Sequence, residues 1–215
     1  MNNFYYFRDF DITNFKKYIF SCAICLFLFF ILLNTCEISA FEKMHLEIIT
    51  FGNIDDKVLT YLSKNLEEIF SIKVYIGSCY DIPQYAYNQK RNQYLALLIL
   101  DKIQPPKENQ KILAIIDKDL YTSGLNFVFG QAEPNKGVCI ISLTRLRQSY
   151  YGLKEDERLF LERALKEAVH EIGHLFNLGH CSNPKCVMHF SNSLLDTDIK
   201  DYHFCNNCKK YLFLR

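Results

Sequence analysis

The sequence predicts a mixed α/β domain from Met44 to the C-terminus, and three observations carry this prediction. Short apolar runs that suit buried strands alternate with segments in which apolar residues recur at helical spacing. Two later β-rich runs flank a turn that contains proline and glycine, as in a hairpin. After about residue 177 the chain has turns and cysteines but too little apolar sequence for a core of its own.

The elements are expected in the order strand, helix, strand, helix, strand, hairpin, helix. The central strand is the compact apolar run KILAIID, because a strand buried on both faces has no polar alternation. Pro105 and Pro106 end the helix before it, since proline cannot continue a helix. The expected strands are 45–52, 73–77, 111–117, 125–132 and 137–143, and the expected helices are 55–70, 89–103 and 156–176.

Length and charge restrict the class of protein. A chain of 215 residues fits one domain of ordinary size plus an extension, and it is long enough to bury a core. The formal net charge of +1 gives no strong attraction to nucleic acid, and the sequence has no phosphate-binding glycine loop. We therefore expect a protein that does not bind nucleic acid, and we expect it to act as a monomer.

Residues 1–43 form an N-terminal leader outside the domain 44–215. Two lysines precede the uncharged apolar run Tyr18–Leu33, which fits the apolar core of a signal peptide with cleavage after Ala40. The run fits a short membrane anchor equally, because about 20 apolar residues span a bilayer. Either interpretation places the domain outside the cytoplasm, since the positive charges stay inside. If Met44 is the true start, the protein is cytoplasmic.

The stretch HEIGHLFNLGHC, which begins at His170, carries the chemistry. His170 and His174 lie four residues apart in a predicted helix, which puts both imidazoles on one face, one turn apart. Two imidazoles so placed can hold one zinc ion, and Glu171 can reach metal-bound water without binding the metal itself. The alternative is a solvent-exposed helix face that matches the HExxH pattern by chance.

A third nitrogen ligand is expected from His180, which lies beyond a turn. Three imidazoles leave one position on zinc for water, as catalytic sites do and structural sites do not. The turn must bring His180 back to the helix, and Asn177 tolerates the left-handed backbone conformation that such a turn requires. We therefore expect His170, His174 and His180 to bind a catalytic zinc.

Four cysteines follow as two closely spaced pairs, Cys181 with Cys186 and Cys205 with Cys208. Cys181 directly follows His180, and consecutive side chains in an extended segment point in opposite directions. Cys181 is therefore expected to serve a second site. Four thiolates suit a closed tetrahedral zinc, which would fasten the tail.

Two alternatives stay open for this second site. In an oxidising compartment the four cysteines would form two disulfides instead. His189 or His203 could replace one cysteine as a ligand, although each fits the spacing less well. Cys79 and Cys139 are isolated and are expected to be small buried hydrophobic residues.

HEIGHLFNLGHC, the CVM that ends at Met188 and the final CNNC together resemble the archaemetzincin family of zinc metalloproteases, in the metzincin clan. The family signature joins HExxHxxG, a His-Cys step, a second cysteine, a methionine two residues on and a CxxC. The one clear departure is Asn177, where the family has glycine. The resemblance extends through PQYAYNQKRNQY, LNFVFGQA and SLTRLRQSYYG and covers essentially residues 44–215.

The resemblance implies a metzincin-like α/β fold. In this fold a twisted mixed sheet with helices lies above a cleft, and a small zinc-stapled C-terminal subdomain lies below it. The resemblance also implies two zinc ions, one catalytic and one structural, and it implies that Met188 forms an apolar floor beneath the catalytic metal. The implied ligands are His170, His174 and His180 for the catalytic zinc and Cys181, Cys186, Cys205 and Cys208 for the structural zinc.

We expect the protein to hydrolyse peptide bonds in peptide or protein substrates. Zinc makes its bound water acidic, and Glu171 is expected to accept the proton as general base. LNFVFG is expected either as an edge strand that pairs with an extended substrate or as interior sheet. The alternative function is a zinc-binding protein of the same fold with little or no peptidase activity. Asn177 favours this alternative slightly, because a shifted His180 would spoil the third ligand.

Overall fold

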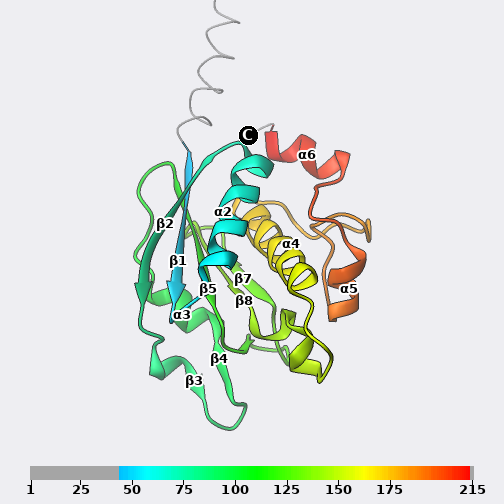
Figure 1. The fold of residues 1–215 in the computed structure, drawn as a ribbon. Helices are drawn as coiled ribbons and strands as arrows, with labels where there is room; N and C mark the ends of the chain where they lie inside the picture. The colour runs from blue at the N-terminus through cyan, green and yellow to red at the C-terminus, as the bar shows by residue number, and fades with distance from the viewer. Residues whose placement is uncertain (1–43, 214–215) are drawn as a thin grey trace, which may run out of the picture. The chain divides into compact units, whose positions relative to one another are not determined.

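A five-stranded mixed sheet forms the centre of the computed structural model, which describes residues 44–213 (Figure 1). The strands lie in the order β2-β1-β5-β8-β7. Four of them are parallel, and β7 at one edge runs antiparallel to its neighbour β8. They are β1 (His45–Phe51), β2 (Lys73–Tyr80), β5 (Gln110–Ile116), β7 (Gly130–Glu133) and β8 (Val138–Ser142). The predicted leader lies outside the described residues.

The central strand β5 divides the core between the two faces of the sheet. Every residue from Ile112 to Ile116 is buried, which confirms the expectation that KILAIID is an interior strand. Ile112, Ala114 and Ile116 pack in one cluster with helix α3 (Ala96–Lys102). Because successive strand residues point to opposite faces, the residues between them serve the other half of the core.

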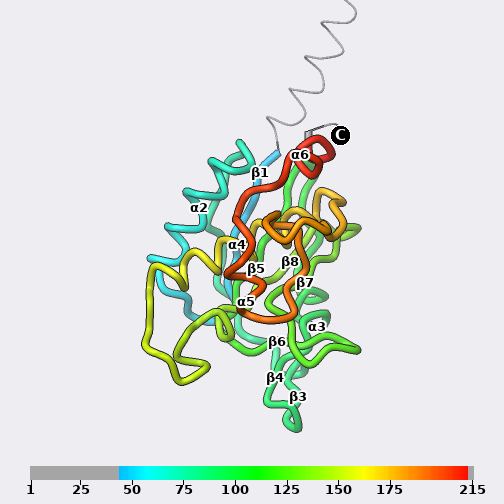
Figure 2. Tube along the Cα trace, turned by 90° about the vertical axis from the view of Figure 1, so that its right-hand side faces the viewer, coloured from blue at the N-terminus to red at the C-terminus, as the bar shows by residue number. Residues whose placement is uncertain are grey.

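Helices α2 (Asp56–Phe70) and α4 (Glu157–Leu175) lie side by side on one face of the sheet, opposite α3 (Figures 1 and 2). Each begins at an aspartate whose side chain accepts a backbone hydrogen bond. Asp55 accepts from the amide of Lys57, and Asp156 accepts from the amide of Leu159. The helices expected over 55–70 and 156–176 are therefore confirmed.

The helix expected over 89–103 begins only at Ala96, so its first half was predicted wrongly. Those residues instead form a small hairpin between β3 (Tyr87–Asn88) and β4 (Gln93–Leu95), which follows the short helix η1 (Gln84–Ala86). The Asn88 side chain accepts hydrogen bonds from the amides of Lys90 and Arg91. Such local bonds take the backbone amides that a helix would need. Strand β4 also pairs with β6 (Leu120–Tyr121) in a three-stranded sheet.

The expected hairpin over 125–132 and 137–143 is present as β7 and β8, but its first strand starts later than predicted. β7 begins at Gly130, and residues 122–129 form a loop above it. Gly137 closes the turn with a left-handed φ of 74°. The strand predicted over 73–77 continues to Tyr80 as β2, an edge strand whose side chains are mostly exposed. Cys79 is accordingly exposed, which corrects the expectation that it is buried.

The chain after β8 passes through the short helices η2 (Thr144–Leu146) and η3 (Gln148–Tyr151) to α4, and then into a tail of turns. Two short helices in this tail were not predicted, α5 (Leu194–Ile199) and α6 (Asn206–Phe213). A capping box between Ser193 and Asp196 starts α5. None of the described helices is both long enough and apolar enough to cross a membrane.

Candidate active site and metal centres

Helix α4 places His170 and His174 one turn apart, with their Nε2 atoms only 3.1 Å from each other. The Nδ1 atom of His170 lies 2.7 Å from the Val187 carbonyl oxygen, and that of His174 lies 2.7 Å from the Leu178 carbonyl oxygen. A carbonyl oxygen only accepts, so each Nδ1 carries the proton and each Nε2 keeps a lone pair. Two lone pairs thus point at one place.

The chain returns His180 to this place through a turn at the end of α4. The amide of Asn177 donates to the His174 carbonyl oxygen at 2.8 Å, and the amide of Leu178 donates to that of Gly173 at 3.1 Å. Asn177 has a φ of 60°, the left-handed conformation that glycine provides in the family signature. One nitrogen from each of His170, His174 and His180 lies within 4.8 Å of the others.

This donor set fits zinc. Nitrogens bound at about 2.0–2.1 Å around a tetrahedral zinc lie roughly 3.3 Å apart, close to the observed 3.1 Å. Burial lowers the pKa of His170 well below its ordinary value, with help from the positive charge of Lys200. Burial also lowers the pKa values of His174 and His180. All three imidazoles are therefore neutral near pH 7, as metal ligands must be.

Glu171 lies beside this histidine cluster and is 5% exposed. Burial raises its pKa well above the ordinary value of a glutamate. Its side chain packs against Gly130, the first residue of β7. A Cβ atom on Gly130 would lie 2.6 Å from Glu171 Cγ, so only glycine leaves room for this carboxyl group.

Met188 lies beneath the helix that carries the ligands and is fully buried. A Cβ atom on Gly173 would collide with the Met188 sulfur, so glycine lets the methionine approach the backbone of α4. The Met188 carbonyl oxygen accepts from the amide of Cys181 at 2.9 Å. The tail therefore runs directly under the histidine cluster.

A cleft of about 520 Å³ opens onto the histidines and Glu171. Gly130, Gln131 and Ala132 of β7 line one side, and the turn from Asn177 to His180 lines another. β7 is the last strand of the five-stranded sheet, so its outer edge faces this cleft without a neighbouring strand in the described residues.

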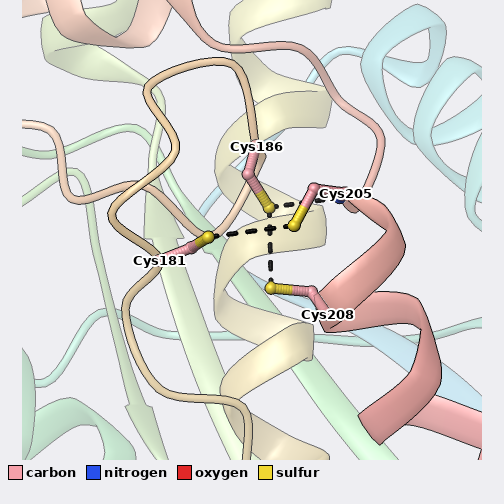
Figure 3. Close-up of side chains that lie close together, drawn as sticks. All are labelled: Cys181, Cys186, Cys205 and Cys208. Carbon is pink, nitrogen blue, oxygen red and sulfur yellow. Dashed lines mark hydrogen bonds between the residues drawn. The ribbon is translucent and has the colours of Figure 1, made fainter.

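The four clustered cysteines form a second centre, apart from the histidines (Figure 3). The sulfur atoms of Cys181 and Cys205 are 3.8 Å apart, and those of Cys186 and Cys208 are 3.7 Å apart. Sulfurs bound at about 2.3 Å around a tetrahedral zinc lie roughly 3.8 Å apart, whereas a disulfide brings them to about 2.05 Å. All four cysteines are free in this structure, and the donor set fits zinc.

Backbone hydrogen bonds favour the thiolate at Cys205, whereas burial raises the pKa of the Cys186 and Cys208 thiols. The backbone amide of Cys205 donates to the Cys186 sulfur at 3.3 Å. A hydrogen bond from the backbone of Cys208 lowers the pKa of the Cys205 thiol to about 7. His189 and His203, which the sequence left open as replacement ligands, belong to neither cluster. His189 contacts the Cys181 carbonyl oxygen, and His203 pairs with Asp201.

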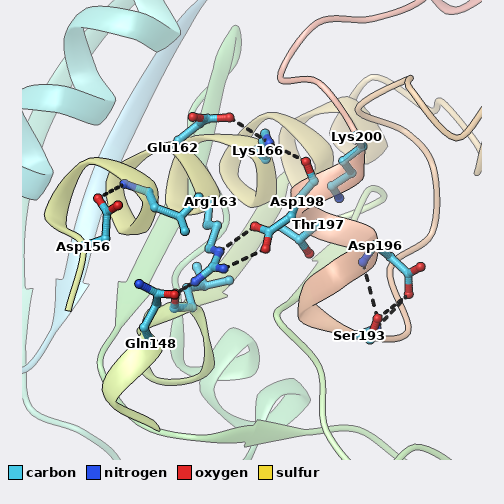
Figure 4. Close-up of polar contacts among 12 residues, drawn as sticks. Gln148, Asp156, Glu162, Arg163, Lys166, Ser193, Asp196, Thr197, Asp198 and Lys200 are labelled. Atoms are coloured by element: carbon cyan, nitrogen blue, oxygen red, sulfur yellow. Dashed lines mark hydrogen bonds and ion pairs between the residues drawn. The ribbon is translucent and has the colours of Figure 1, made fainter. Parts of the chain in front are cut away.

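Sequence reasoning missed a buried ion pair next to the histidines. Lys200 Nζ lies 3.0 Å from Glu167 Oε1, and both side chains are at least 96% buried. Thr197 also donates to Glu167 Oε1, at 3.1 Å. Figure 4 shows further polar contacts between α4 and α5, nearer the start of α4, where Arg163 and Lys166 contact Asp198. No local signal in the sequence indicated this pair, because Lys200 and Glu167 lie 33 residues apart.

Together, the sheet, the ligand-bearing helix and the cleft define a zinc-dependent metallopeptidase. The model of peptidase family M54 matches residues 33–213, and the chain belongs to this family, the archaemetzincins. The resemblance seen in the sequence is thus confirmed. The match begins 11 residues upstream of the domain boundary expected at residue 44.

Relatives and solved structures agree with this assignment. The chain is 47% identical over 173 residues to an archaemetzincin of Pyrococcus furiosus, an alignment that covers 77% of this chain and 90% of that protein. It is 44% identical over 161 residues to one of Methanocaldococcus jannaschii, covering 75% and 88%. The crystal structure of an archaemetzincin from Archaeoglobus fulgidus, complexed with malonate, superposes with a TM-score of 0.70 at 38% identity. That alignment covers 78% of this chain and 99% of the other.

Proposed function

We propose that His170, His174 and His180 bind one zinc ion and that Glu171 acts as the general base in peptide-bond hydrolysis. The observation that carries the proposal is the 3.1 Å approach of two Nε2 lone pairs beside a buried carboxyl group. Unprotonated nitrogens repel each other at this distance unless a cation lies between them. A purely structural site would use its fourth position for another ligand and would need no base nearby.

Glu171 and Gly130 have separate roles in the proposed reaction. When bound here, zinc supplies a Lewis acid that polarises the scissile carbonyl group and makes water more acidic. Glu171 accepts a proton from the attacking water at its carboxylate and passes it to the leaving amine nitrogen. Its raised pKa favours the first step, because a carboxylate with a higher pKa is a stronger base. Gly130 fixes where that carboxylate lies.

We propose further that an extended peptide binds along the outer edge of β7. The main-chain groups of an edge strand can pair with a substrate as an added strand. This assigns the edge role to residues 130–133 rather than to the whole of LNFVFG, of which only Gly130 belongs to β7. The scissile bond would then lie over the histidines, which line the same cleft.

A second zinc on Cys181, Cys186, Cys205 and Cys208 completes the proposal, giving two zinc ions per chain. This ion would fasten the tail under the histidine cluster. The peptidase domain is proposed to be 44–215 and to act as a monomer. The leader, residues 1–43, remains predicted as a signal peptide or membrane anchor that places the domain outside the cytoplasm, unless Met44 is the true start.

Replacement of Glu171 by Ala tests the mechanism. We expect hydrolysis of a peptide library to fall by at least about 100-fold, the usual scale of a lost general base, while zinc content stays at two per chain. Glu155→Ala is the matched control, because Glu155 is an exposed carboxylate before α4. Unchanged turnover in Glu171→Ala would overturn the role of Glu171. Absence of turnover in the zinc-loaded wild-type protein would favour the zinc-binding protein without peptidase activity.

A further inference from the structure

The loop of residues 122–129, here called the rim loop, forms one wall of the cleft. Its residues Leu125 and Val128 line the space above the histidines. Few backbone hydrogen bonds hold the loop, and one of them, from the amide of Ser142 to the Phe129 carbonyl oxygen at 2.8 Å, fixes only its last residue. The amide of Val128 donates to the Leu120 carbonyl oxygen at 3.0 Å, and that of Leu125 donates to Thr122 at 3.2 Å. The wall therefore depends on contacts from elsewhere in the chain.

Arg91 makes the most direct of these contacts, although it lies more than 30 residues earlier in the chain. Its Nη2 atom donates to the carbonyl oxygens of Leu125 at 3.2 Å and Asn126 at 2.7 Å. Its guanidinium group also stacks on the ring of Tyr121, 4.4 Å from the ring centre. A planar guanidinium can make these contacts at once, whereas the single ammonium of lysine cannot reproduce the stacked, forked geometry.

Gln93 adds a buried contact to the same carbonyl group. It accepts from Arg91 Nε at 2.9 Å and donates to the Asn126 carbonyl oxygen at 3.0 Å. The same amide lies 3.1 Å from Asp119, whose carboxylate is held by Arg145 at 2.6 and 2.8 Å. These bonds link the rim loop to three separate parts of the chain.

Arg145, which binds Asp119, also contacts the rim loop directly. Its guanidinium lies over the ring of Phe127, 4.2 Å from the ring centre. Two arginines thus contact the loop at adjacent positions. Arg91 binds the carbonyl oxygens of residues 125 and 126, and Arg145 lies over the ring of residue 127. The three sequence stretches PQYAYNQKRNQY, LNFVFGQA and SLTRLRQSYYG meet here, and the function proposed above uses only residues 130–132 of the second.

The turn that presents Arg91 has hydrogen bonds of its own. Asn88 accepts from the Arg91 amide at 3.3 Å, and Asn92 has a left-handed φ of 51°. The Tyr87 hydroxyl donates to the Asn92 side chain at 2.8 Å. A preformed turn lowers the entropy that Arg91 loses on reaching the rim loop.

We infer that Arg91 is a positioning residue that holds the rim loop so that Leu125 and Val128 form a fixed wall for the side chains of a bound peptide. The inference rests on the proposed peptidase function, since it assigns this wall to that substrate. Arg91 touches main-chain carbonyls of the loop and none of the groups assigned to the chemistry. Its loss should therefore weaken peptide binding and leave the metal centre intact.

Binding of two hydroxamates to zinc-loaded protein tests this inference without requiring turnover. Acetohydroxamate probes the metal centre alone, and a peptidyl hydroxamate probes the metal centre together with the wall. In Arg91→Ala we expect the affinity for the peptidyl hydroxamate to fall about tenfold, as for loss of a charge-assisted hydrogen bond. Affinity for acetohydroxamate should stay within about twofold, and Arg91→Lys should recover only part of the loss.

Arg158→Ala is the matched control, because Arg158 is exposed on α4 and lines no part of the cleft. Equal affinity of wild type and Arg91→Ala for the peptidyl hydroxamate would overturn the inference, as would an equal loss for both probes. If neither hydroxamate binds the wild-type protein, the proposed metal centre fails instead. Hydrogen exchange then decides the inference, since faster exchange at the Val128 amide in Arg91→Ala supports it and unchanged exchange overturns it.

Discussion

Gly130 on β7 and Glu171 on α4 lie far apart in the chain, yet the Glu171 side chain occupies the space that a side chain at position 130 would need. We expect Gly130→Ala to displace the Glu171 carboxylate and lower kcat by about 100-fold, the cost of a misplacement of roughly 1 Å. Zinc content should not change. Gly152→Ala is the control for glycine replacement: its φ of 73° makes alanine strained there, but a Cβ atom meets nothing within 4 Å, so stability should fall while kcat stays normal. Normal kcat in Gly130→Ala would show that the carboxylate tolerates a shifted position.

The raised pKa of Glu171 predicts a pH-dependent cost to stability. A folded-state pKa above the unfolded value means that stability is fully present below the unfolded pKa and is lost as the pH rises through the folded pKa. Once zinc has been removed from the histidines, Glu171→Gln should therefore raise the urea midpoint at pH 8 and change it little at pH 4. Midpoints at these two pH values check this. A larger gain at pH 4 than at pH 8 would contradict the sign.

The buried pair of Lys200 and Glu167 should respond asymmetrically to mutation. Lys200→Met leaves a carboxylate buried without its partner, and we expect the free energy of unfolding to fall by about 3–5 kcal/mol. Lys200→Met combined with Glu167→Leu should recover much of that loss, because both charges are then absent. Lys57→Met removes an exposed ion pair with Glu157 and should have no measurable effect in the same urea titration. Equal losses in the single and double variants would contradict this account.

The cysteine centre should act on the histidine centre through one hydrogen bond. His170 Nδ1 donates to the carbonyl oxygen of Val187, the residue that follows Cys186. In Cys186→Ala we expect loss of the second zinc and a weakening of zinc binding at the histidines by about 10–100-fold, as for other orienting partners. Metal content during competition with a chelator measures both. Cys79→Ser, at an exposed cysteine outside both clusters, is the control.

Asn177 should tolerate glycine and resist alanine. Its φ of 60° costs an ordinary L-residue about 1–2 kcal/mol, and asparagine lowers that cost. Asn177→Gly should therefore keep wild-type turnover. Asn177→Ala should lower the thermal midpoint and weaken zinc binding, because the strained turn would displace His180. Melting curves and zinc titration of the two variants check this. If Asn177→Gly were the less active variant, the asparagine side chain would have a role beyond the turn.

The parts of this protein that follow from local pattern were predictable from the sequence. The apolar run of β5 and the helical spacing in α2 and α4 each point to one structure, because their burial follows the period of the element. The HExxH spacing placed two imidazoles together for the same reason. The hairpin at 88–93 was not predictable, since the side chain of Asn88 competes with the helix that the flanking residues favour.

Contacts between segments far apart in the chain could not be predicted from the sequence either. Nothing local indicates that Gly130 makes room for Glu171, or that Lys200 is buried against Glu167. The expected ligand sets nevertheless lie together as predicted, because the motif spacing fixes one half of each cluster. The turn at Asn177 and the tail supply the other half.

His180 and Cys181 are consecutive in the chain and belong to different clusters. A metal ion at either cluster would order the turn that both share, so part of the entropic cost of the second ion would already be met by the first. Such linkage is reciprocal, so each ion would raise the affinity for the other by the same factor. Zinc uptake by this protein would then be cooperative, and chelation of one ion would weaken the binding of its neighbour.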